Sequence, residues 1–340
     1  MLVSDFDYDL PPDRIAQEPL PARDASRLLL LDRLTGAVAH RRFREIADLL
    51  RPDDVLVVND SKVIPARLHG RKATGGRAEV LLVRPLGADE WLAMTRPGLP
   101  PGGRVVVEQH GRHLTVEAQA VRDDGLRQVR LETPSGDVAA ALAQLGELPT
   151  PPYIHTHLAD PARYQTIYAA PEGSIAAPTA GLHFTPRVLA TLEERGIAVE
   201  RLTLHVGPGT FLPVRTAAVD DHQMHAEWYT LTPEVAARLT AARRAGRRIV
   251  AIGTTTCRAL ESAAQSGELQ PGSGETTLFI TPGYQFRAIN GLLTNFHLPR
   301  STLLMLVSAF AGREHVLTAY ADAVRSGYRF YSFGDAMLIV

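Results

Sequence analysis

Residues that could carry out chemistry concentrate in four segments of this sequence, each between an expected strand and an expected helix. The segments are residues 163–186, 203–211, 249–256 and 293–302. In α/β proteins, ligands bind where strands end and helices begin, and the free N–H groups of a helix N-terminus favour anions. We therefore expect ligand-binding residues at these junctions.

The first segment places small residues around a histidine. Thr179, Gly181 and His183 precede Thr185-Pro186, which is typical of a helix start. Small residues let the backbone approach a ligand closely, and the helix start favours an anion. The alternative for His183, which lies between two apolar residues, is an interior histidine whose hydrogen bonds are satisfied within the protein.

The second segment ends an expected strand near His205 and continues into a glycine-rich turn. Gly207 and Gly209 belong to this turn, and Thr210 follows it. A single turn of this kind is a weak signal and is more often ordinary turn chemistry. It does not match G-x-G-x-x-G, so it predicts no Rossmann dinucleotide site.

The third segment brings threonines to an expected helix start. Thr254, Thr255 and Thr256 follow the apolar run 249–252. Their hydroxyls and free backbone N–H groups could bind a carboxylate or a phosphate, although an N-cap with surplus hydroxyls explains the pattern equally well. The spacing does not match a P-loop and no lysine is near, so ATP hydrolysis is not expected.

The fourth segment joins a strand end to another polar helix start. Asn295 and His297 could contact or polarise a base, and Arg300 with Ser301 suits an anion. Packing alone would explain the apolar residues among them.

The C-terminal segment 328–337 combines aromatic residues with Asp335. Aromatic faces can stack on adenine or on an RNA base that is splayed out of its helix. An aromatic-rich final strand is the simpler interpretation of this segment.

Several histidines invite comparison with metal sites. His155 and His157 are two residues apart, and His222 and His225 lie close to Glu227. The second pair shares a face only in a helix, whereas residues 228–230 favour a strand. Because the spacing matches no common zinc scheme, we predict no metal site.

The elements that must position these residues alternate between strands and helices. We expect strands at 28–32, 54–59, 198–206, 248–252, 277–281 and 291–294, with a hairpin turn at 35–36. We expect helices at 43–50, 185–195, 233–245, 254–265, 302–310 and 315–326. This alternation predicts an α/β body with a mixed, largely parallel sheet.

A segment with a different sequence pattern separates the two halves of this body. Short alternating segments appear at 78–84, 91–95, 104–108, 113–120 and 127–132, divided mostly by Gly, Pro or Asp. Evenly spaced short strands predict a small antiparallel β-barrel or sandwich. We therefore expect a β-barrel domain at 65–150, inserted into an α/β catalytic body formed by 1–64 and 151–340.

Composition narrows the class of protein. The chain has 340 residues, a formal net charge of −1 and a single cysteine, Cys257, which excludes an internal disulfide framework. The N-terminus is acidic and aromatic, unlike a secretory signal, and the apolar stretch 303–311 is too short to span a membrane. We expect a cytoplasmic protein without a membrane partner. The charge is not that of a non-specific nucleic-acid binder, although a local basic patch would suffice for RNA.

Longer strings, spread in order along the chain, carry a specific resemblance. They cover residues 5–11, 15–17, 23–28, 58–67, 176–185, 204–211, 253–262, 294–310 and 328–339. In these strings the chain resembles the S-adenosylmethionine:tRNA ribosyltransferase-isomerase family of queuosine synthesis. Departures are mild: Ser61, Cys257 and Phe333 stand where threonine, valine and tyrosine are common. Residues 65–150 match least.

The resemblance implies both a fold and a reaction. It implies an α/β body with a smaller β-barrel, and transfer and isomerisation of the ribosyl moiety of S-adenosylmethionine onto 7-aminomethyl-7-deazaguanine at the tRNA wobble position. The products would be epoxyqueuosine-tRNA, adenine and methionine. S-adenosylmethionine would be a consumed substrate, so no separate cofactor is expected.

That chemistry suggests roles for the candidate residues. The sulfonium acidifies the C5′ hydrogens, so a base is needed, and an acid would help adenine leave. His183 and His205 are the leading acid/base candidates, followed by His297, because imidazole serves both roles near neutral pH. Asp60, or Asp335 as a second choice, would pair with the sulfonium or orient a histidine.

The remaining candidates are predicted to bind the two substrates. Thr254 and its neighbours would hold the methionine carboxylate. The full set expected to bind S-adenosylmethionine is Thr179, Gly181, Gly207, Gly209, Thr210, Thr254, Thr255 and Asp335, and the set expected to contact tRNA phosphate is Lys62, Arg163 and Arg300. An RNA-binding module without chemistry and an S-adenosylmethionine methyltransferase remain as alternatives, although no glycine-rich loop after a first strand supports the latter.

Overall fold

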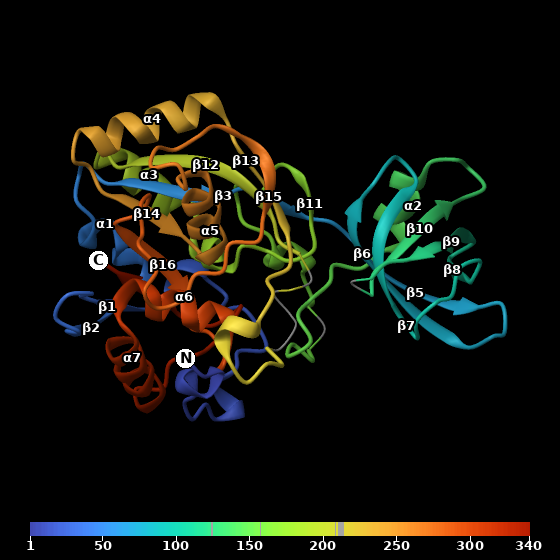
Figure 1. The fold of residues 1–340 in the computed structure, drawn as a ribbon, viewed down its shortest axis with the longest axis horizontal. Helices are drawn as coiled ribbons and strands as arrows, with labels where there is room; N and C mark the ends of the chain where they lie inside the picture. Colours follow the sequence, from blue (N-terminus) through green and yellow to red (C-terminus); the bar gives the residue numbers. More distant parts are fainter. Residues whose placement is uncertain (124, 157, 208, 210–213) are drawn as a thin grey trace. The chain divides into compact units, whose positions relative to one another are not determined.

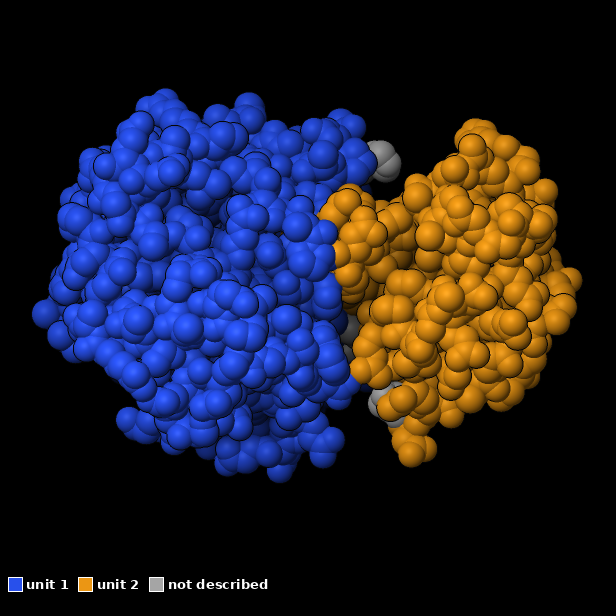
Figure 2. Space-filling model, turned by 90° about the horizontal axis from the view of Figure 1, so that it is seen from above, with its two compact units in different colours: residues 1–61, 152–171, 178–340 blue, residues 62–151, 172–177 orange. Residues whose placement is uncertain are grey.

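The computed structural model describes residues 1–123, 125–156, 158–207, 209 and 214–340. These residues form two compact units, which are coloured separately in Figure 2. The first, here called the α/β unit, comprises residues 1–61, 152–171 and 178–340. The second, the barrel unit, comprises residues 62–151 and 172–177. The chain therefore enters and leaves the barrel unit twice.

A nine-stranded sheet organises the α/β unit, with the order β15-β13-β12-β3-β14-β16-β17-β1-β2 (Figure 1). Its strands are β1 (Arg27–Leu31), β2 (Val38–Arg42), β3 (Val55–Asn59), β12 (Ala198–His205), β13 (Glu227–Leu231), β14 (Ile249–Ile252), β15 (Gly272–Thr276), β16 (Gly291–Asn295) and β17 (Ala336–Ile339). The pairs β12–β3, β3–β14, β14–β16 and β17–β1 are parallel, and the other pairs are antiparallel. Together with the separate barrel, this mixed sheet confirms the fold class predicted from the sequence.

The carboxyl ends of β12, β3, β14 and β16 lie at one edge of the sheet because these neighbours run parallel. The register aligns Leu202 with Asn59, and Ile252 with both Val58 and Leu293. Residues that end or follow these strands are therefore brought together, as the strand-to-helix rule predicts.

Helices connect the strands of the α/β unit. They are α1 (Ile46–Leu49), α3 (Pro186–Glu194), α4 (Pro233–Arg244), α5 (Thr254–Ala263), α6 (Thr302–Ala311) and α7 (Arg313–Arg325). Side-chain oxygens of Thr185, Thr232 and Ser301 accept the N–H groups of residues three positions later, at the starts of α3, α4 and α6. These caps confirm the predicted helix starts, because each satisfies a backbone donor that lacks a partner within the helix.

The sheet is buried on both faces. Leu56 and Val58 of β3 pack with Val188 and Leu192 of α3 in one hydrophobic cluster. Val57, which points to the opposite face, is also fully buried. Near-continuous apolar strands of this kind are typical of sheets covered on both sides.

The barrel unit is a closed antiparallel barrel with the strand order β10-β7-β6-β5-β8-β9. Its strands are β5 (Arg67–Lys72), β6 (Arg77–Pro85), β7 (Glu90–Arg96), β8 (Arg104–Gln109), β9 (Arg112–Val121) and β10 (Arg127–Glu132). Helix α2 (Val138–Leu145) follows the barrel, and β4 (Lys62–Val63) pairs in parallel with β11 (Glu172–Ser174). The sequence predicts β6 to β10, but neither β5 nor α2.

Both missed elements have weak sequence patterns. In β5 the inner face carries Leu68 and Gly70, so one large apolar side chain is all that marks it. A Cβ at Gly70 would lie 2.5 Å from the Val106 carbonyl oxygen, which explains the glycine. Helix α2 has eight residues and begins after Asp137, whose side chain accepts the Ala140 N–H.

Two expectations for strands are wrong. No strand forms at 277–281; the strand β15 lies just before it, because Leu278 donates its N–H to Thr276 Oγ1 and offers its carbonyl to Arg258 Nε. Residues 328–335 also do not form a strand. Tyr331 has φ of 74° and its carbonyl accepts the Gly334 N–H, so the aromatic segment is a tight turn and the last strand begins at Ala336.

No helix among the described residues is long and apolar enough to cross a membrane.

Candidate active site

The carboxyl edge of the sheet in the α/β unit gathers polar residues from several strand ends. Asn59 ends β3, His205 ends β12, Gly253 follows β14 and Asn295 ends β16. The 3₁₀ helix η6 (Thr179–His183) contacts β16 at this edge. All of these elements belong to one compact unit, so the fold itself sets their relative positions.

Asn59 ties these strand ends together. Its Oδ1 accepts the N–H groups of Ser61 and Leu204 at 3.1 and 3.0 Å. Its Nδ2 donates to the Leu204 carbonyl at 2.9 Å and to Thr255 Oγ1 at 3.3 Å. This buried amide therefore joins β3 and β12 to the first turn of α5, with its donors and acceptors in use.

His183 lies in a hydrogen-bonded chain of buried polar groups. Its Nδ1 is 2.8 Å from Ser26 Oγ, and its Nε2 is 3.3 Å from Asn295 Nδ2. Thr179 Oγ1 donates to Asn295 Oδ1 at 3.0 Å, and Asn295 Nδ2 also donates to the Tyr331 carbonyl at 3.2 Å. Ser26 and Asn295, which are distant in sequence, thus bond opposite nitrogens of one imidazole ring.

These hydrogen bonds fix the tautomer of His183. Because the Asn295 amide offers an N–H to Nε2, that nitrogen must act as acceptor. The proton then sits on Nδ1 and is donated to Ser26 Oγ, which in turn donates to the Arg23 carbonyl at 3.3 Å. The arrangement is satisfied only with a neutral imidazole whose Nε2 lone pair points at an amide.

The surroundings of His183 keep it neutral. The ring is 5% exposed and stacks on Phe43 with centroids 5.0 Å apart. Burial lowers the pKa of His183 to about 4, and the nearby Arg23 and Arg329 guanidinium groups lower it further. A cavity of about 30 Å³ adjoins the ring and is also lined by Arg23, Ser26 and Phe333. The imidazole thus borders a small cavity with room for about one water molecule.

His205 lies at the same edge but in a more open setting. Burial lowers the pKa of His205, and the Asp60 carboxylate opposes that shift. Asp60 accepts a hydrogen bond from Thr203 Oγ1 at 2.7 Å, and burial raises the pKa of its carboxyl. His205 Nδ1 is buried without a hydrogen-bond partner among the described residues. The structure therefore brings Asp60 and His205 together as an electrostatic pair.

The start of α5 lies against η6. Gly253 has φ of +93°, and a Cβ there would be 3.6 Å from Ala180 Cβ and 3.7 Å from Thr255 Oγ1. Thr256 Oγ1 donates to the Ile252 carbonyl at 2.7 Å, so it caps the strand end instead of facing a ligand. Thr254 and Thr255 remain beside η6, where a helix N-terminus favours an anion.

Gly181 lies close to the side chains of Tyr168 and Thr166. A Cβ at this position would lie 2.2 Å from the Tyr168 hydroxyl oxygen and 2.9 Å from Thr166 Cγ2. Within the described ranges, the hydroxyls of Tyr168, Thr166 and Ser61 are buried and lack hydrogen-bond partners. Buried polar groups are nearly always bonded, so such a concentration at one edge is typical of a functional site.

The side chains of His297 and Asp335 both form hydrogen bonds within the protein. Burial lowers the pKa of His297 to about 3. Its ring forms a hydrogen bond with Thr294 Oγ1 at 2.9 Å, and the Tyr8 and Tyr320 hydroxyls form hydrogen bonds with its backbone. Asp335 accepts the backbone N–H groups of Arg27 and Arg329 at 2.7 and 2.8 Å. Burial raises the pKa of the Asp335 carboxyl, although these two donors act in the opposite direction.

The glycine-rich turn after β12 is held by a buried ion pair. The Gly207 N–H donates to Glu227 Oε1 at 2.9 Å, and the other carboxylate oxygen pairs with Arg258. A Cβ at Gly209 would lie 2.8 Å from the His225 ring. The predicted ligand Thr210 lies outside the described residues.

The three cations expected to contact tRNA each have a partner within the protein. Lys62, in the barrel unit, pairs with Glu172 at 2.9 Å. Arg163 donates to the backbone carbonyls of Leu20 and Pro21, and Arg300 pairs with Asp7. Contact of these three side chains with tRNA stays a prediction.

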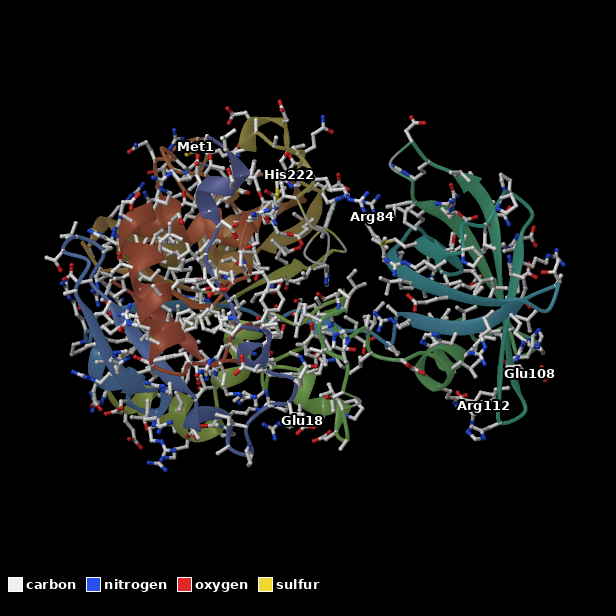
Figure 3. All side chains as sticks on the ribbon, turned by 90° about the horizontal axis from the view of Figure 1, so that it is seen from below. Met1, Glu18, Arg84, Glu108, Arg112 and His222 are labelled. Atoms are coloured by element: carbon white, nitrogen blue, oxygen red, sulfur yellow. The ribbon has the colours of Figure 1, made fainter. Side chains whose placement is uncertain are left out.

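Metal-ligating residues are not clustered in the part of the chain that the structure describes, where no group of three or more His, Cys, Asp or Glu could hold an ion. His222, labelled in Figure 3, packs on Phe279 with ring centroids 5.3 Å apart. The segment Glu227–Leu231 is a strand, which confirms that the His222 and His225 pair does not continue into a helix.

Sequence reasoning missed Ser26, Asn59 and Tyr168. Asn59 ends an apolar strand, so the rule that selects polar residues at strand ends could have included it. Ser26 carries no such signal, because it lies far along the chain from all four junctions. Tyr168 lies within the first segment, but no local pattern singles it out there.

Comparison with known proteins places this geometry in a family. The family model described as "Queuosine biosynthesis protein" matches residues 3–339. The chain belongs to this queuosine biosynthesis family. Proteins named "S-adenosylmethionine:tRNA ribosyltransferase-isomerase" from Moorella thermoacetica and Heliobacterium modesticaldum are 54% and 51% identical to it, in each case over 100% of both chains.

A solved structure belongs to the same set of relatives. The crystal structure of an S-adenosylmethionine tRNA ribosyltransferase from Thermotoga maritima is 40% identical, with a TM-score of 0.58. The match covers 99% of this chain and 100% of that one. Membership in the queuosine biosynthesis family therefore applies to the whole length, including the residues of the carboxyl-edge site.

Proposed function

We propose that this protein transfers and isomerises the ribosyl moiety of S-adenosylmethionine onto 7-aminomethyl-7-deazaguanine at the wobble position of tRNA. Epoxyqueuosine-tRNA, adenine and methionine are the products. The substrates are tRNA and S-adenosylmethionine, the latter consumed as a ribosyl donor, so the reaction needs no separate cofactor. The proposal includes a cytoplasmic location, where tRNA and S-adenosylmethionine meet.

The observation that carries this proposal is the neutral imidazole of His183 at the carboxyl edge of the sheet. The reaction begins with removal of a proton next to the sulfonium, and a neutral histidine can accept it. The Nε2 lone pair of His183 is held by a single amide N–H at 3.3 Å, a weak bond that a substrate can replace. His183 is therefore the stronger candidate for the general base.

His205 suits the complementary role. Its neighbour Asp60 favours the protonated imidazole and opposes the effect of burial on the His205 pKa. A protonated histidine can assist departure of adenine by donating a proton to the base. The Asp60 carboxylate can also face the sulfonium cation, since opposite charges attract most strongly in a partly buried site.

The start of α5 offers a place for the methionine carboxylate. Thr254 and Thr255 present hydroxyls and backbone N–H groups beside η6, and the helix N-terminus is electropositive. Gly253 leaves room for a ligand to approach the backbone here, whereas the space beside Gly181 is filled by Tyr168. This orientation would direct the sulfonium toward Asp60 and His183, which lie at the same edge of the sheet.

Product analysis tests the function directly. The full chain is incubated with S-adenosylmethionine and with tRNA that carries 7-aminomethyl-7-deazaguanine. We expect adenine and methionine to be released in equal amounts as epoxyqueuosine-tRNA forms, and tRNA with an ordinary guanine at the wobble position to give none. Transfer of a labelled methyl group to tRNA without adenine would instead indicate a methyltransferase, and tight tRNA binding without turnover would indicate an RNA-binding module.

A further inference from the structure

The barrel unit carries a groove of about 780 Å³ that the proposed reaction does not use. All of its lining residues belong to this one unit. The charged and titratable residues that line it are His69 and Arg71 of β5, Arg77 and Glu79 of β6, Arg96 of β7 and Glu108 of β8. The groove is therefore a feature of one folded barrel.

Arginines face each other across this groove. The register sets Arg71 directly opposite Arg77, and Arg96 opposite Glu79. Like charges in directly opposed positions destabilise a strand pair, so the Arg71–Arg77 pair has a cost that folding does not explain. A bound anion would remove that cost by lying between the guanidinium groups.

Arg77 and Arg96 of the groove are available to a ligand, whereas Arg71 Nη1 donates to the Gly75 carbonyl at 3.0 Å. Arg77 and Arg96 are exposed, and in the described ranges their side chains form no hydrogen bond or ion pair. Of the two acidic residues that line the groove, Glu79 lies 4.0 Å from Arg67, and Glu108 is exposed, so the three arginines outnumber them. Binding through Arg77 and Arg96 would therefore break no existing contact.

Small residues keep the groove open. Gly70 and Ala78 contribute to its lining, between the charged side chains. At Gly70 a side chain has no space, because a Cβ would meet the backbone of Val106 at 2.5 Å. Strand β5 can thus lie close to β8 without a side chain that fills the groove.

We propose that this groove binds the sugar-phosphate backbone of tRNA. The inference rests on the proposed function, which makes tRNA the polyanion that this chain must hold. Guanidinium groups bind phosphate oxygens through paired N–H donors. Three arginines on adjacent strands suit a chain of phosphates better than a single small anion.

Binding measurements with charge-matched variants test this inference. The full chain is compared with R77Q/R96Q and with R104Q/R112Q, which removes two arginines of the same barrel that do not line the groove. Arg112 is labelled beside Glu108 in Figure 3 and begins β9. The probe is tRNA carrying 7-aminomethyl-7-deazaguanine, and its Kd is measured from low to moderate salt.

We expect R77Q/R96Q to raise the Kd for tRNA about tenfold and to flatten its salt dependence by roughly 0.7–0.9 in the logarithmic slope per lost contact. The control variant should bind as the unmodified protein does, and R77K/R96K should recover most of the affinity because it retains the charge. Equal Kd values for R77Q/R96Q and the unmodified protein would overturn the inference. Equal losses in the groove and control variants would also overturn it, since they would report only net charge.

Turnover separates this inference from the proposed function. At saturating tRNA, R77Q/R96Q should release adenine with an unchanged kcat, while its KM for tRNA rises about as much as the Kd. If the unmodified protein released no adenine, the proposed function would fail, whereas a selective loss of tRNA affinity in R77Q/R96Q would still support the groove. If the unmodified protein released adenine normally and R77Q/R96Q kept its tRNA affinity, the proposed function would stand and the groove inference would be overturned.

Discussion

At the scale of single residues, the carboxyl-edge site is defined by which atoms carry protons. His183 is neutral with its proton on Nδ1, because Ser26 accepts on one side and the Asn295 amide donates on the other. His205 instead has an unpartnered Nδ1 and a carboxylate nearby. Burial lowers the pKa of both histidines, and a nearby carboxylate opposes that shift only at His205.

Alanine substitution of each histidine tests these assignments. H183A and H205A should each lower kcat for adenine release by roughly 10²- to 10⁴-fold, the usual contribution of general acid–base catalysis. The KM for S-adenosylmethionine should change less than kcat does, because neither ring is proposed to provide most of the binding. Steady-state adenine release with saturating tRNA measures both constants.

A surface histidine of the same unit provides the control for these variants. His40 bonds the Tyr328 hydroxyl at 2.8 Å and lies outside the carboxyl edge, so H40A should keep a near-normal kcat. A near-normal kcat in both H183A and H205A would remove the acid/base assignment and leave the ribosyl transfer to other groups.

At the scale of elements, η6 is positioned by the absence of a side chain. Gly181 allows η6 to lie against Tyr168, and η6 carries both Thr179 and His183 into the site. Asn59 performs a comparable task for β3, β12 and α5 through its four hydrogen bonds. The site therefore depends on close contacts between elements as much as on the residues that would touch substrate.

Substitution of Gly181 tests this dependence. G181A would place a methyl group 2.2 Å from the Tyr168 hydroxyl oxygen, so η6 or Tyr168 must move. We expect a loss of about 1–3 kcal/mol in the free energy of unfolding, typical of overpacking, together with a lower kcat. Denaturant unfolding and adenine release measure the two effects.

A second substitution shows whether the clash is the cause. Removing the hydroxyl in G181A/Y168F leaves the ring carbon at 3.1 Å as the nearest Tyr168 atom, which should restore part of the lost stability. If Y168F gave no recovery in the G181A background, the loss would have to arise elsewhere in η6.

At the scale of the whole molecule, two buried histidines link folding to pH. Burial lowers the pKa of His183 to about 4 and of His297 to about 3, below the unfolded value near 6.5. The unfolded chain therefore binds protons that the folded chain excludes once the pH falls below about 6.5. Their contribution to stability is present above that pH and is lost as the pH falls toward 4 and 3.

The expected size of this effect can be measured. Each histidine should remove up to about 1.4 kcal/mol of unfolding free energy per pH unit between pH 6.5 and its folded pKa. Denaturant unfolding at pH 7.5 and pH 5 should show this slope, and H183Q and H297Q should each reduce it. Buried carboxyls such as Asp335 titrate in all of these proteins, so the difference between proteins isolates the histidines. An unchanged slope in both variants would contradict the prediction.

The sequence by itself determined the order of elements and the places where chemistry could occur. Apolar runs that end in polar residues are visible locally, so the ends of β12, β14 and β16 and the caps of α3 and α4 could be read directly. The same local signals are weak in β5 and misleading at 277–281, where side chains such as Arg258 bind the backbone. Local pattern therefore predicted elements best where hydrophobic burial decides them.

Only the tertiary structure decided which candidates work together. His183, His205 and His297 look alike in the sequence, but packing gives the first a pocket, the second a carboxylate and the third a buried place among aromatic rings. Ser26 reaches His183 across 157 positions of the chain. Charge state and hydrogen-bond partner depend on neighbours that are distant in sequence, and no local pattern contains them.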